Sequence, residues 1–226
     1  MRFGDLPARL TEVRQRIGEA TRRGGHGQEV RIIAVTKTHG PDAVAAAWKA
    51  GLEDVGENRI QEAVIKMAAD SPPVHWHLIG HLQRNKVKSA DGFYLVHSID
   101  SIRLAEAADA HARATARTLG CLVQMNVVGE ETKGGFSPDE LPAAADRLAA
   151  MDRLDVRGVM TMAPLNASES DLRQVFGGAR NARAILQGRG FKAAELSMGM
   201  SGDYEIAVEE GATYVRLGTV LFGERA

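Results

Sequence analysis

Short apolar stretches alternate with longer amphipathic stretches along almost the whole chain. The short stretches are rich in β-branched residues, which is typical of buried strands, whereas the longer ones repeat apolar residues every three or four positions, as helices do. The pattern predicts eight strands, at Ile32–Thr36, Asp54–Val55, Val74–Ile79, Tyr94–Ser98, Leu122–Asn126, Val156–Thr161, Ala194–Ser197 and Tyr214–Leu217.

Helices are predicted before the first strand and between the strands. The first runs from Leu6 to Arg22, and the others are Pro41–Ala50, Ile60–Ala69, Ile102–Arg117, Pro138–Met151, Leu172–Gln187 and Tyr204–Glu210. Strands that alternate with helices favour parallel βαβ units, and eight such units favour closure into an α/β fold, the (β/α)8 barrel of the TIM type. We therefore expect a TIM-type barrel with one extra N-terminal helix.

The length of the chain agrees with a single barrel. Such barrels typically have about 250 residues, so we expect the 226 residues to form one domain, 1–226. The alternative fold is an open doubly wound sheet. The phosphate-binding fingerprint G-x-G-x-x-G of many such sheets is missing after the first predicted strand.

The composition limits the partners of the protein. The 28 Lys and Arg residues against 29 Asp and Glu residues give a formal net charge of −1, so no overall field attracts nucleic acid or an anionic membrane. Cys121 is the only cysteine, which excludes an intrachain disulfide and fits a reducing compartment. No apolar signal core opens the sequence, and no apolar run approaches the ~18 residues of a membrane span. We expect a cytoplasmic protein and, without an extended apolar surface pattern, a monomer.

The stretch from Arg31 to Gly40 ends an apolar run with a lysine. Strand alternation places Ile33, Val35 and Lys37 on one face, and of the seven lysines only Lys37 closes an apolar strand. Two interpretations stay open from this segment alone. The side chain extends to solvent, or its desolvation lowers the pKa of the amine, which can then attack a carbonyl and form a Schiff base.

The last predicted strand supplies a second cation. Tyr214 and Arg216 share a face opposite Val215 and Leu217, so Arg216 points into the barrel mouth if the two apolar residues pack under the helices. The first and last strands of a closed barrel are neighbours, which brings Lys37 and Arg216 close together. Two cations in one pocket repel each other unless an anion lies between them or the lysine is neutral. The pair therefore indicates a binding site.

Two glycine-containing loops follow the seventh and eighth strands, with the sequences Gly199-Met200-Ser201-Gly202 and Gly218-Thr219. Glycines let backbone N–H groups converge, and Ser201 and Thr219 add hydroxyl donors. Either loop alone is equally well explained as a turn with a helix N-cap at Ser201 or Asp203. Barrels often bind phosphate with these two loops, so the pair favours a phosphate site.

Three histidines follow one another closely at His75, His77 and His81. Their spacing resembles that of metal ligands, but no nearby pattern supplies a clear carboxylate ligand. We therefore expect no metal, and we expect the histidines to fill the barrel interior or its mouth through hydrogen bonds.

Three further polar residues have two interpretations each. Asn58, after the second strand, either donates to a ligand oxygen or caps the following helix. Gln124 and Asn126 alternate on the fifth strand, either as inward ligand-binding groups or as members of a satisfied interior network.

A phosphate site, a strand-end lysine and an inward arginine together describe a site for pyridoxal 5'-phosphate. In it Lys37 would hold the aldehyde as an internal aldimine. An arginine that faces the ring nitrogen disfavours protonation of that nitrogen, and this weakens the ring as an electron sink.

These motifs resemble the pyridoxal phosphate homeostasis protein family (the YggS/PROSC group), whose barrel is similar to the N-terminal domain of alanine racemase. They occur in order over nearly the whole chain. The matching segments are Ala34-Val35-Thr36-Lys37, Gly56-Glu57-Asn58 with Gln61-Glu62, the run from Trp76 to Gln83 with Asn85-Lys86, Gly129-Glu130 with Lys133, the run from Leu196 to Ser201, and the run from Arg216 to Thr219 with Phe222-Gly223.

The resemblance implies a role for each site residue. It implies that Lys37 is the aldimine lysine, that Arg216 is the partner of the ring nitrogen, and that Ser201, Gly218 and Thr219 hold the phosphate. It also implies further residues around the cofactor, namely Asn58, Met160, Ser197, Gly199 and Met200. The resemblance further implies that the protein is a carrier and regulator of vitamin B6 and amino-acid pools, without an established reaction. Its implied ligands are pyridoxal phosphate and free amino acids.

Two other functions stay open. One is a small pyridoxal phosphate-dependent racemase or lyase, and the other is a barrel enzyme that uses the amine of Lys37 on a phosphorylated substrate without a cofactor. An alanine racemase takes a second base, a tyrosine, from an extra β domain. Tyr94, Tyr204 and Tyr214 are the only tyrosines of this sequence, and none is expected on such a domain.

Overall fold

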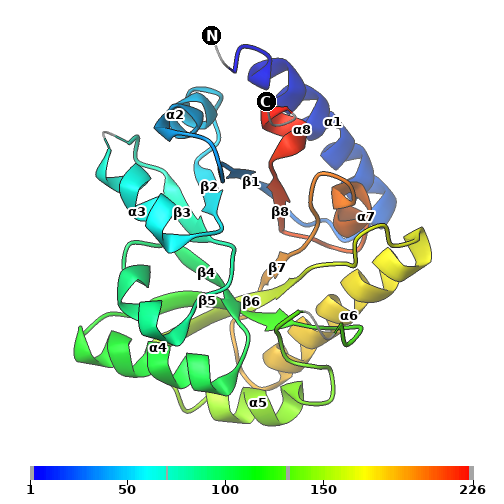
Figure 1. Ribbon diagram of the computed structural model, residues 1–226. Helices are drawn as coiled ribbons and strands as arrows, with labels where there is room; N and C mark the ends of the chain where they lie inside the picture. The colour runs from blue at the N-terminus through cyan, green and yellow to red at the C-terminus, as the bar shows by residue number, and fades with distance from the viewer. Residues whose placement is uncertain (1–2, 70, 131–132, 224–226) are drawn as a thin grey trace.

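Eight parallel strands close into a barrel in the computed structural model, which describes residues 3–69, 71–130 and 133–223 (Figure 1). The strands are β1 (Arg31–Val35), β2 (Asp54–Glu57), β3 (His75–Leu78), β4 (Leu95–Ile99), β5 (Leu119–Met125), β6 (Leu154–Thr161), β7 (Glu195–Ser197) and β8 (Tyr214–Leu217). Each strand pairs with the next, and β8 pairs with β1. The predicted (β/α)8 barrel is confirmed, and the open sheet is excluded because no edge strand is left.

Helices surround the barrel, and α1 lies alongside α7 and α8 (Figure 1). They are α1 (Leu6–Gly24), α2 (Pro41–Lys49), α3 (Ile60–Ala68), the 3-10 helix η1 (Arg84–Ala90), α4 (Ile102–Ala114), α5 (Leu141–Leu148), α6 (Glu169–Gly188), α7 (Tyr204–Glu209) and α8 (Thr219–Phe222). The predicted extra N-terminal helix is α1, and Arg23 ties it to α7 with its Nε 2.6 Å from Oε1 of Glu209. Within the described ranges no helix combines the length and the apolar character that crossing a membrane requires.

Side chains alternate between the two faces of the barrel wall. Val215 and Leu217 pack with the surrounding helices in the main core. The inward side chains form a second, smaller apolar cluster of Ile33, Leu95, Leu122, Met160 and Tyr214. Because Arg216 lies between Val215 and Leu217, the alternation turns it toward the lumen, as predicted.

Two predicted helix ends were wrong because of local backbone features. Helix α4 stops short of the predicted Arg117, since Ala116 adopts a left-handed conformation with φ of 51°. Helix α6 begins before the predicted Leu172, because the side chains and backbones of Ser168 and Asp171 form a capping box. The short helices η1 and α8 were not predicted.

Two other boundaries also differ from the prediction. Helix α5 begins at Leu141, after the predicted Pro138, because residues 138–140 form a turn instead of the first turn of the helix. Strand β5 begins before the predicted Leu122, since residues 119–121 already pair with β6. Hydrophobic periodicity alone does not encode these boundaries.

We expect Gly158→Ala to lower the free energy of unfolding by roughly 2 kcal/mol or more, because β6 and β7 approach too closely for a side chain there. A Cβ atom at this position would lie 1.9 Å from the carbonyl oxygen of Glu195. The control is Gly188→Ala in α6, where a Cβ atom meets nothing within 4 Å and a better helix former is introduced. Urea denaturation of both variants measures the difference, and equal stabilities would contradict the packing argument.

Candidate functional site

Lys37 lies in the turn that directly follows β1. Its side chain is half-buried, and it forms no hydrogen bond or ion pair with any residue of the described part of the chain. The next residue, Thr38, adopts a left-handed backbone conformation with φ of 67°. A β-branched residue is strained there, so the surrounding contacts must hold the turn.

A buried ion pair between Lys66 and Glu57 holds the backbone at the start of this turn. The ammonium of Lys66 lies 2.5 Å from Oε1 of Glu57, and it also donates to the carbonyl oxygen of Thr36 at 2.8 Å. The hydroxyl of Thr36 donates to the same carboxylate oxygen. All three side chains are buried. The pair therefore fixes the residue that precedes Lys37, and the amine of Lys66 is fully engaged.

Arg216 is the buried cation of the site, with only 4% of its surface exposed. Its Nη1 donates to the carbonyl oxygen and the hydroxyl of Ser197, at 2.8 and 2.7 Å, and its Nη2 donates to the carbonyl oxygen of Thr161 at 3.0 Å. Desolvation lowers the pKa of Arg216 to about 10, although the charge of Asp203 opposes this shift. No carboxylate among the described residues hydrogen-bonds to the guanidinium, and such a buried cation favours a bound anion.

The barrel brings Lys37 and Arg216 to neighbouring strands. Ile33 of β1 pairs with Arg216 of β8, and Lys37 follows four positions along the chain from Ile33. The pairing of the first and last strands is as predicted, and it places the two residues on adjacent strands and the turn that follows.

The loop after β7 is docked on β8 and α8. Gly199 has a φ of 92°, and a Cβ atom there would lie 2.6 Å from the Cβ of Ala207, so both the conformation and the packing require glycine. Its carbonyl oxygen accepts the N–H of Arg216 at 2.9 Å. The hydroxyl of Ser201 accepts the N–H of Val220 at 3.4 Å. The two loops that the sequence singled out therefore meet.

Four backbone N–H groups on these loops have no acceptor among the described residues. They belong to Ser201, Gly202, Gly218 and Thr219. Unpaired, converging backbone donors are what a phosphate group requires. Asp203 occupies the N-cap position of α7, as the alternative interpretation of this loop has it, but its carboxylate accepts the N–H of Met200 at 2.5 Å and no N–H of α7.

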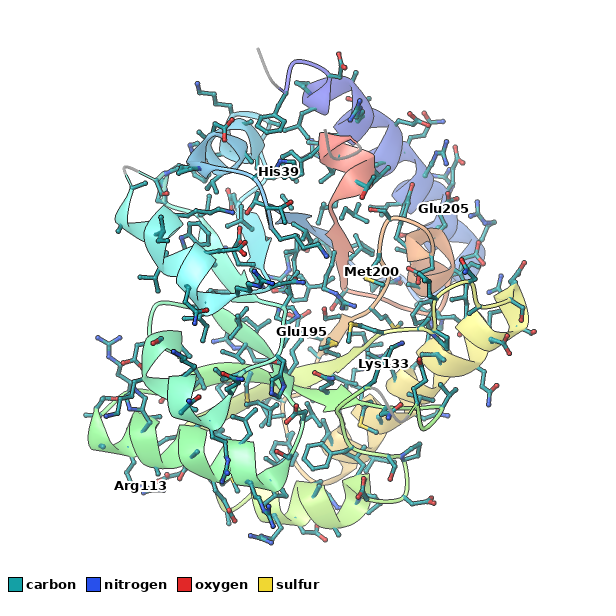
Figure 2. The ribbon with its side chains drawn as sticks, in the orientation of Figure 1. His39, Arg113, Lys133, Glu195, Met200 and Glu205 are labelled. Atoms are coloured by element: carbon teal, nitrogen blue, oxygen red, sulfur yellow. The ribbon has the colours of Figure 1, made fainter. Side chains whose placement is uncertain are left out.

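The remaining predicted residues take different places. Met160 lies in the apolar cluster of the lumen, whereas Asn58 is exposed and does not cap α3, whose first flanking residue is Arg59. Met200 is partly exposed and borders the same groove as Lys133, and both lie on loops that face the centre of the barrel (Figure 2).

Gln124 and Asn126 hold the loop that contains Lys133. The amide of Gln124 donates to the carbonyl oxygen of Gly134 at 2.7 Å, and that of Asn126 donates to the carbonyl oxygens of Glu130 and Lys133. The ammonium of Lys133 lies 2.6 Å from Oε1 of Glu130. These amides thus form a satisfied network, which was one of the two interpretations, and Lys133 is ion-paired.

Of the three histidines, only His77 is buried in the barrel. Its Nε2 lies 2.8 Å from Oδ1 of Asp54, and its Nδ1 lies 2.9 Å from Nε2 of His97. His75 and His81 have exposed fractions of 47% and 66% for their side chains, so of the predicted places, the interior or the mouth, only His77 takes the interior. Nδ1 of His75 lies 3.3 Å from Oδ1 of Asp54, and Nδ1 of His81 lies 3.0 Å from Oδ2 of Asp100. The described residues contain no group of three or more His, Cys, Asp or Glu side chains that is arranged to hold a metal ion.

The sequence analysis missed Asp54, His97, Glu57 and Lys66. Asp54 opens a short strand and His97 stands inside an apolar one, so their inward alternation was the only available signal. Glu57 and Lys66 lie on different elements, and nothing in their spacing predicts a buried pair.

Burial disfavours the charged form of the two interior histidines. Desolvation lowers the pKa of His77, although its hydrogen bond to Asp54 opposes the shift. Desolvation also lowers the pKa of His97 well below its usual value, and His77 and Arg216 act in the same direction. Burial alone would raise the pKa of Asp54, but the hydrogen bond from His77 and nearby positive groups lower it overall.

We expect the free energy of unfolding to fall as the pH drops from about 7 to 5, because the buried histidines stay neutral while the unfolded chain takes up their protons near a pKa of about 6.5. Each histidine contributes a slope of up to about 1.4 kcal/mol per pH unit in this window. His97→Gln should reduce the total slope by up to that amount. Urea denaturation between pH 5 and 7 measures it, and an unchanged slope would show that His97 is protonated in the fold.

The chain resembles known proteins over almost its whole length. The family model described as "Alanine racemase, N-terminal domain" matches residues 9–226. The "Pyridoxal phosphate homeostasis protein" of Aquifex aeolicus (strain VF5) is 40% identical over 222 residues, which cover 96% of this chain and 97% of that protein. The protein of the same name from Escherichia coli (strain K12) is 37% identical over 232 residues, with 99% and 98% covered.

Solved structures show the same barrel. PipY of Synechococcus elongatus PCC7942, solved with PLP bound, has a TM-score of 0.85 and 36% identity, covering 96% of this chain and 100% of PipY. Alanine racemase of Clostridium difficile 630 has a TM-score of 0.71 and 17% identity, covering 98% of this chain and 56% of the racemase. At that identity the racemase supports the fold alone.

Proposed function

Because this chain belongs to the pyridoxal phosphate homeostasis protein family, we propose that it binds pyridoxal 5'-phosphate and acts in vitamin B6 homeostasis and amino-acid balance. One observation carries this proposal. Among the described residues, a lysine amine without an ionic partner and a buried arginine without a carboxylate partner lie at adjacent strands, beside two loops whose N–H donors find no acceptor in that part of the chain. The binding of PLP by PipY, the similar barrel from Synechococcus elongatus, supports the choice of cofactor.

Lys37 holds the cofactor as an internal aldimine in this proposal. A Schiff base needs an amine that is free to lose its proton, and a carboxylate in contact opposes that loss. Lys66 is paired with Glu57 and Lys133 with Glu130, whereas Lys37 has no such partner among the described residues. The strained turn and the buried pair beneath it hold the Lys37 backbone in one place.

The two loops would hold the phosphate. Ser201, Gly218 and Thr219 supply hydroxyl and backbone N–H donors, and Gly199 and Met200 shape the first loop. A Cβ atom at Gly218 would lie 3.6 Å from Val35, which is an ordinary van der Waals distance. The protein atoms around Gly218 therefore do not crowd this position.

Arg216 would face the ring nitrogen, with Ser197 holding the guanidinium, Met160 beneath it in the lumen and Asn58 at the exposed rim. A charged donor at the ring nitrogen opposes its protonation, so the site binds the cofactor without strongly activating it. This argument favours a carrier over an enzyme. Free amino acids, which exchange with lysine amines at such a carbonyl, are its second class of ligand.

We further propose that the whole function lies in one barrel domain, residues 1–226, of a cytoplasmic monomer that needs neither nucleic acid nor a membrane. The balanced charge and the absence of a long apolar surface pattern support this part of the proposal. Static light scattering should give the mass of one chain at all concentrations. A constant mass of two chains would contradict the monomer.

Lys37→Ala should abolish covalent attachment of pyridoxal phosphate and leave the fold intact, because the substitution removes an unpaired, half-buried cation and opens no core cavity. Borohydride reduction of the unaltered protein, followed by peptide mass spectrometry, should locate the adduct on Lys37. Lys133→Ala is the control and should keep the adduct.

An adduct on Lys133 or Lys66 would overturn the assignment of the lysine. The racemase or lyase alternative makes a different prediction, namely exchange of the amino-acid α-proton at an enzymatic rate of about 1 s⁻¹ or more. Tyr214 does not favour that alternative, since it is buried in the lumen, where desolvation raises the pKa of its hydroxyl above the usual range.

A further inference from the structure

Five polar side chains form an unbroken line of hydrogen bonds through the lumen. Asp54 Oδ1 lies 2.8 Å from Nε2 of His77, and Nδ1 of His77 lies 2.9 Å from Nε2 of His97. Nδ1 of His97 lies 2.9 Å from Oγ of Ser197, which lies 2.7 Å from Nη1 of Arg216. The residues come from β2, β3, β4, β7 and β8. Since β4 and β7 are not neighbours, the line crosses the lumen from wall to wall.

The chemistry of the groups fixes the direction of every bond. A carboxylate only accepts, so a neutral His77 donates to Asp54 from Nε2, and its Nδ1 carries no hydrogen. Nε2 of His97 therefore donates to Nδ1 of His77, and Nδ1 of a neutral His97 accepts the hydroxyl hydrogen of Ser197. A guanidinium only donates, so Ser197 accepts from Arg216. With both histidines neutral, all four bonds run from Arg216 toward Asp54.

This direction matters for the buried guanidinium. Arg216 hydrogen-bonds to carbonyl and hydroxyl oxygens but to no carboxylate of the described chain. Aligned hydrogen bonds polarise one another, by about 10–30% per bond. The negative charge of Asp54 thereby strengthens each bond up to the one that holds Nη1.

We propose that Asp54, His77, His97 and Ser197 form a one-way hydrogen-bond relay through which the charge of Asp54 holds the Arg216 guanidinium in a fixed orientation at the barrel mouth. The four residues are positioning residues, since they act through Arg216. The effect on ligand affinity rests on the proposed binding of pyridoxal phosphate at this site. The hydrogen-bond directions and the hold on Arg216 do not depend on it.

A purely structural network makes a different prediction for Asp54→Asn. Asparagine keeps the shape of the side chain and an oxygen that accepts from His77, but it has no charge. Asp155→Asn is the matched control, because Asp155 pairs with Arg157 on β6 and is not part of the line. If packing alone orients Arg216, the two variants should behave alike.

The first measurement uses the ligand-free protein labelled with ¹⁵N. Both His77 and His97 should carry hydrogen on Nε2 only, with a scalar coupling between Nε2 of His97 and Nδ1 of His77. Hydrogen exchange at the Nη groups of Arg216 should become roughly tenfold faster in Asp54→Asn and in Ser197→Ala, and it should stay unchanged in Asp155→Asn. A hydrogen on Nδ1 of either histidine, or equal exchange in the two Asn variants, would overturn the relay.

The second measurement is titration with pyridoxal phosphate. Asp54→Asn should raise its Kd roughly three- to tenfold, and Asp155→Asn should leave it unchanged. If the unaltered protein does not bind pyridoxal phosphate, the proposed function fails, while the exchange data still decide the relay. If the unaltered protein binds and the two Asn variants have the same Kd, the relay has no role in binding and this part of the inference is wrong.

Discussion

Closure of the barrel is the constraint on which the rest of the structure depends. Once β8 pairs with β1, alternate side chains of every strand point into the lumen, where a polar group needs a hydrogen-bond partner from another strand. Apolar residues fill part of this space. The other inward positions include His77, His97 and Ser197, which have no exposed surface and satisfy one another. Groups that are far apart in the sequence thereby depend on each other, and the polar lumen becomes part of the candidate site.

The same closure explains why one lysine differs from the others. Outside the barrel wall, Lys66 reaches Glu57 beneath the first turn, and near the rim Lys133 reaches Glu130. A buried ion pair contributes little net stability, because desolvation of both charges offsets their attraction. Its effect here is positional, since it anchors the carbonyl oxygen of Thr36 next to Lys37. The pair thus fixes the start of a turn in which the amine of Lys37 has no ionic partner within residues 3–69, 71–130 and 133–223.

Hydrophobic alternation was sufficient to predict the barrel and the inward direction of Arg216, because Val215 and Leu217 on either side of it are strongly apolar. Glycine and hydroxyl residues were sufficient to select the two loops that meet at Ser201 and Val220. The line from Asp54 to Arg216 was not predictable, because its partners depend on the register of strands and on a contact across the lumen. The start of α6 was missed for a similar reason, since the side chain of Ser168 sets it.

The buried charge of Arg216 has two opposite consequences for a ligand at the barrel mouth. In surroundings of low dielectric constant it attracts an anion, and the free N–H groups of the neighbouring loops offer that anion further donors. The same positive charge opposes protonation of any ring nitrogen placed beside it. A ligand such as pyridoxal phosphate would therefore be bound by the very charge that limits its capacity to withdraw electrons. Similarity to the alanine racemase of Clostridium difficile shows the barrel alone, so at the proposed site the balance between binding and reactivity would depend on local groups such as Arg216 and its partner Ser197.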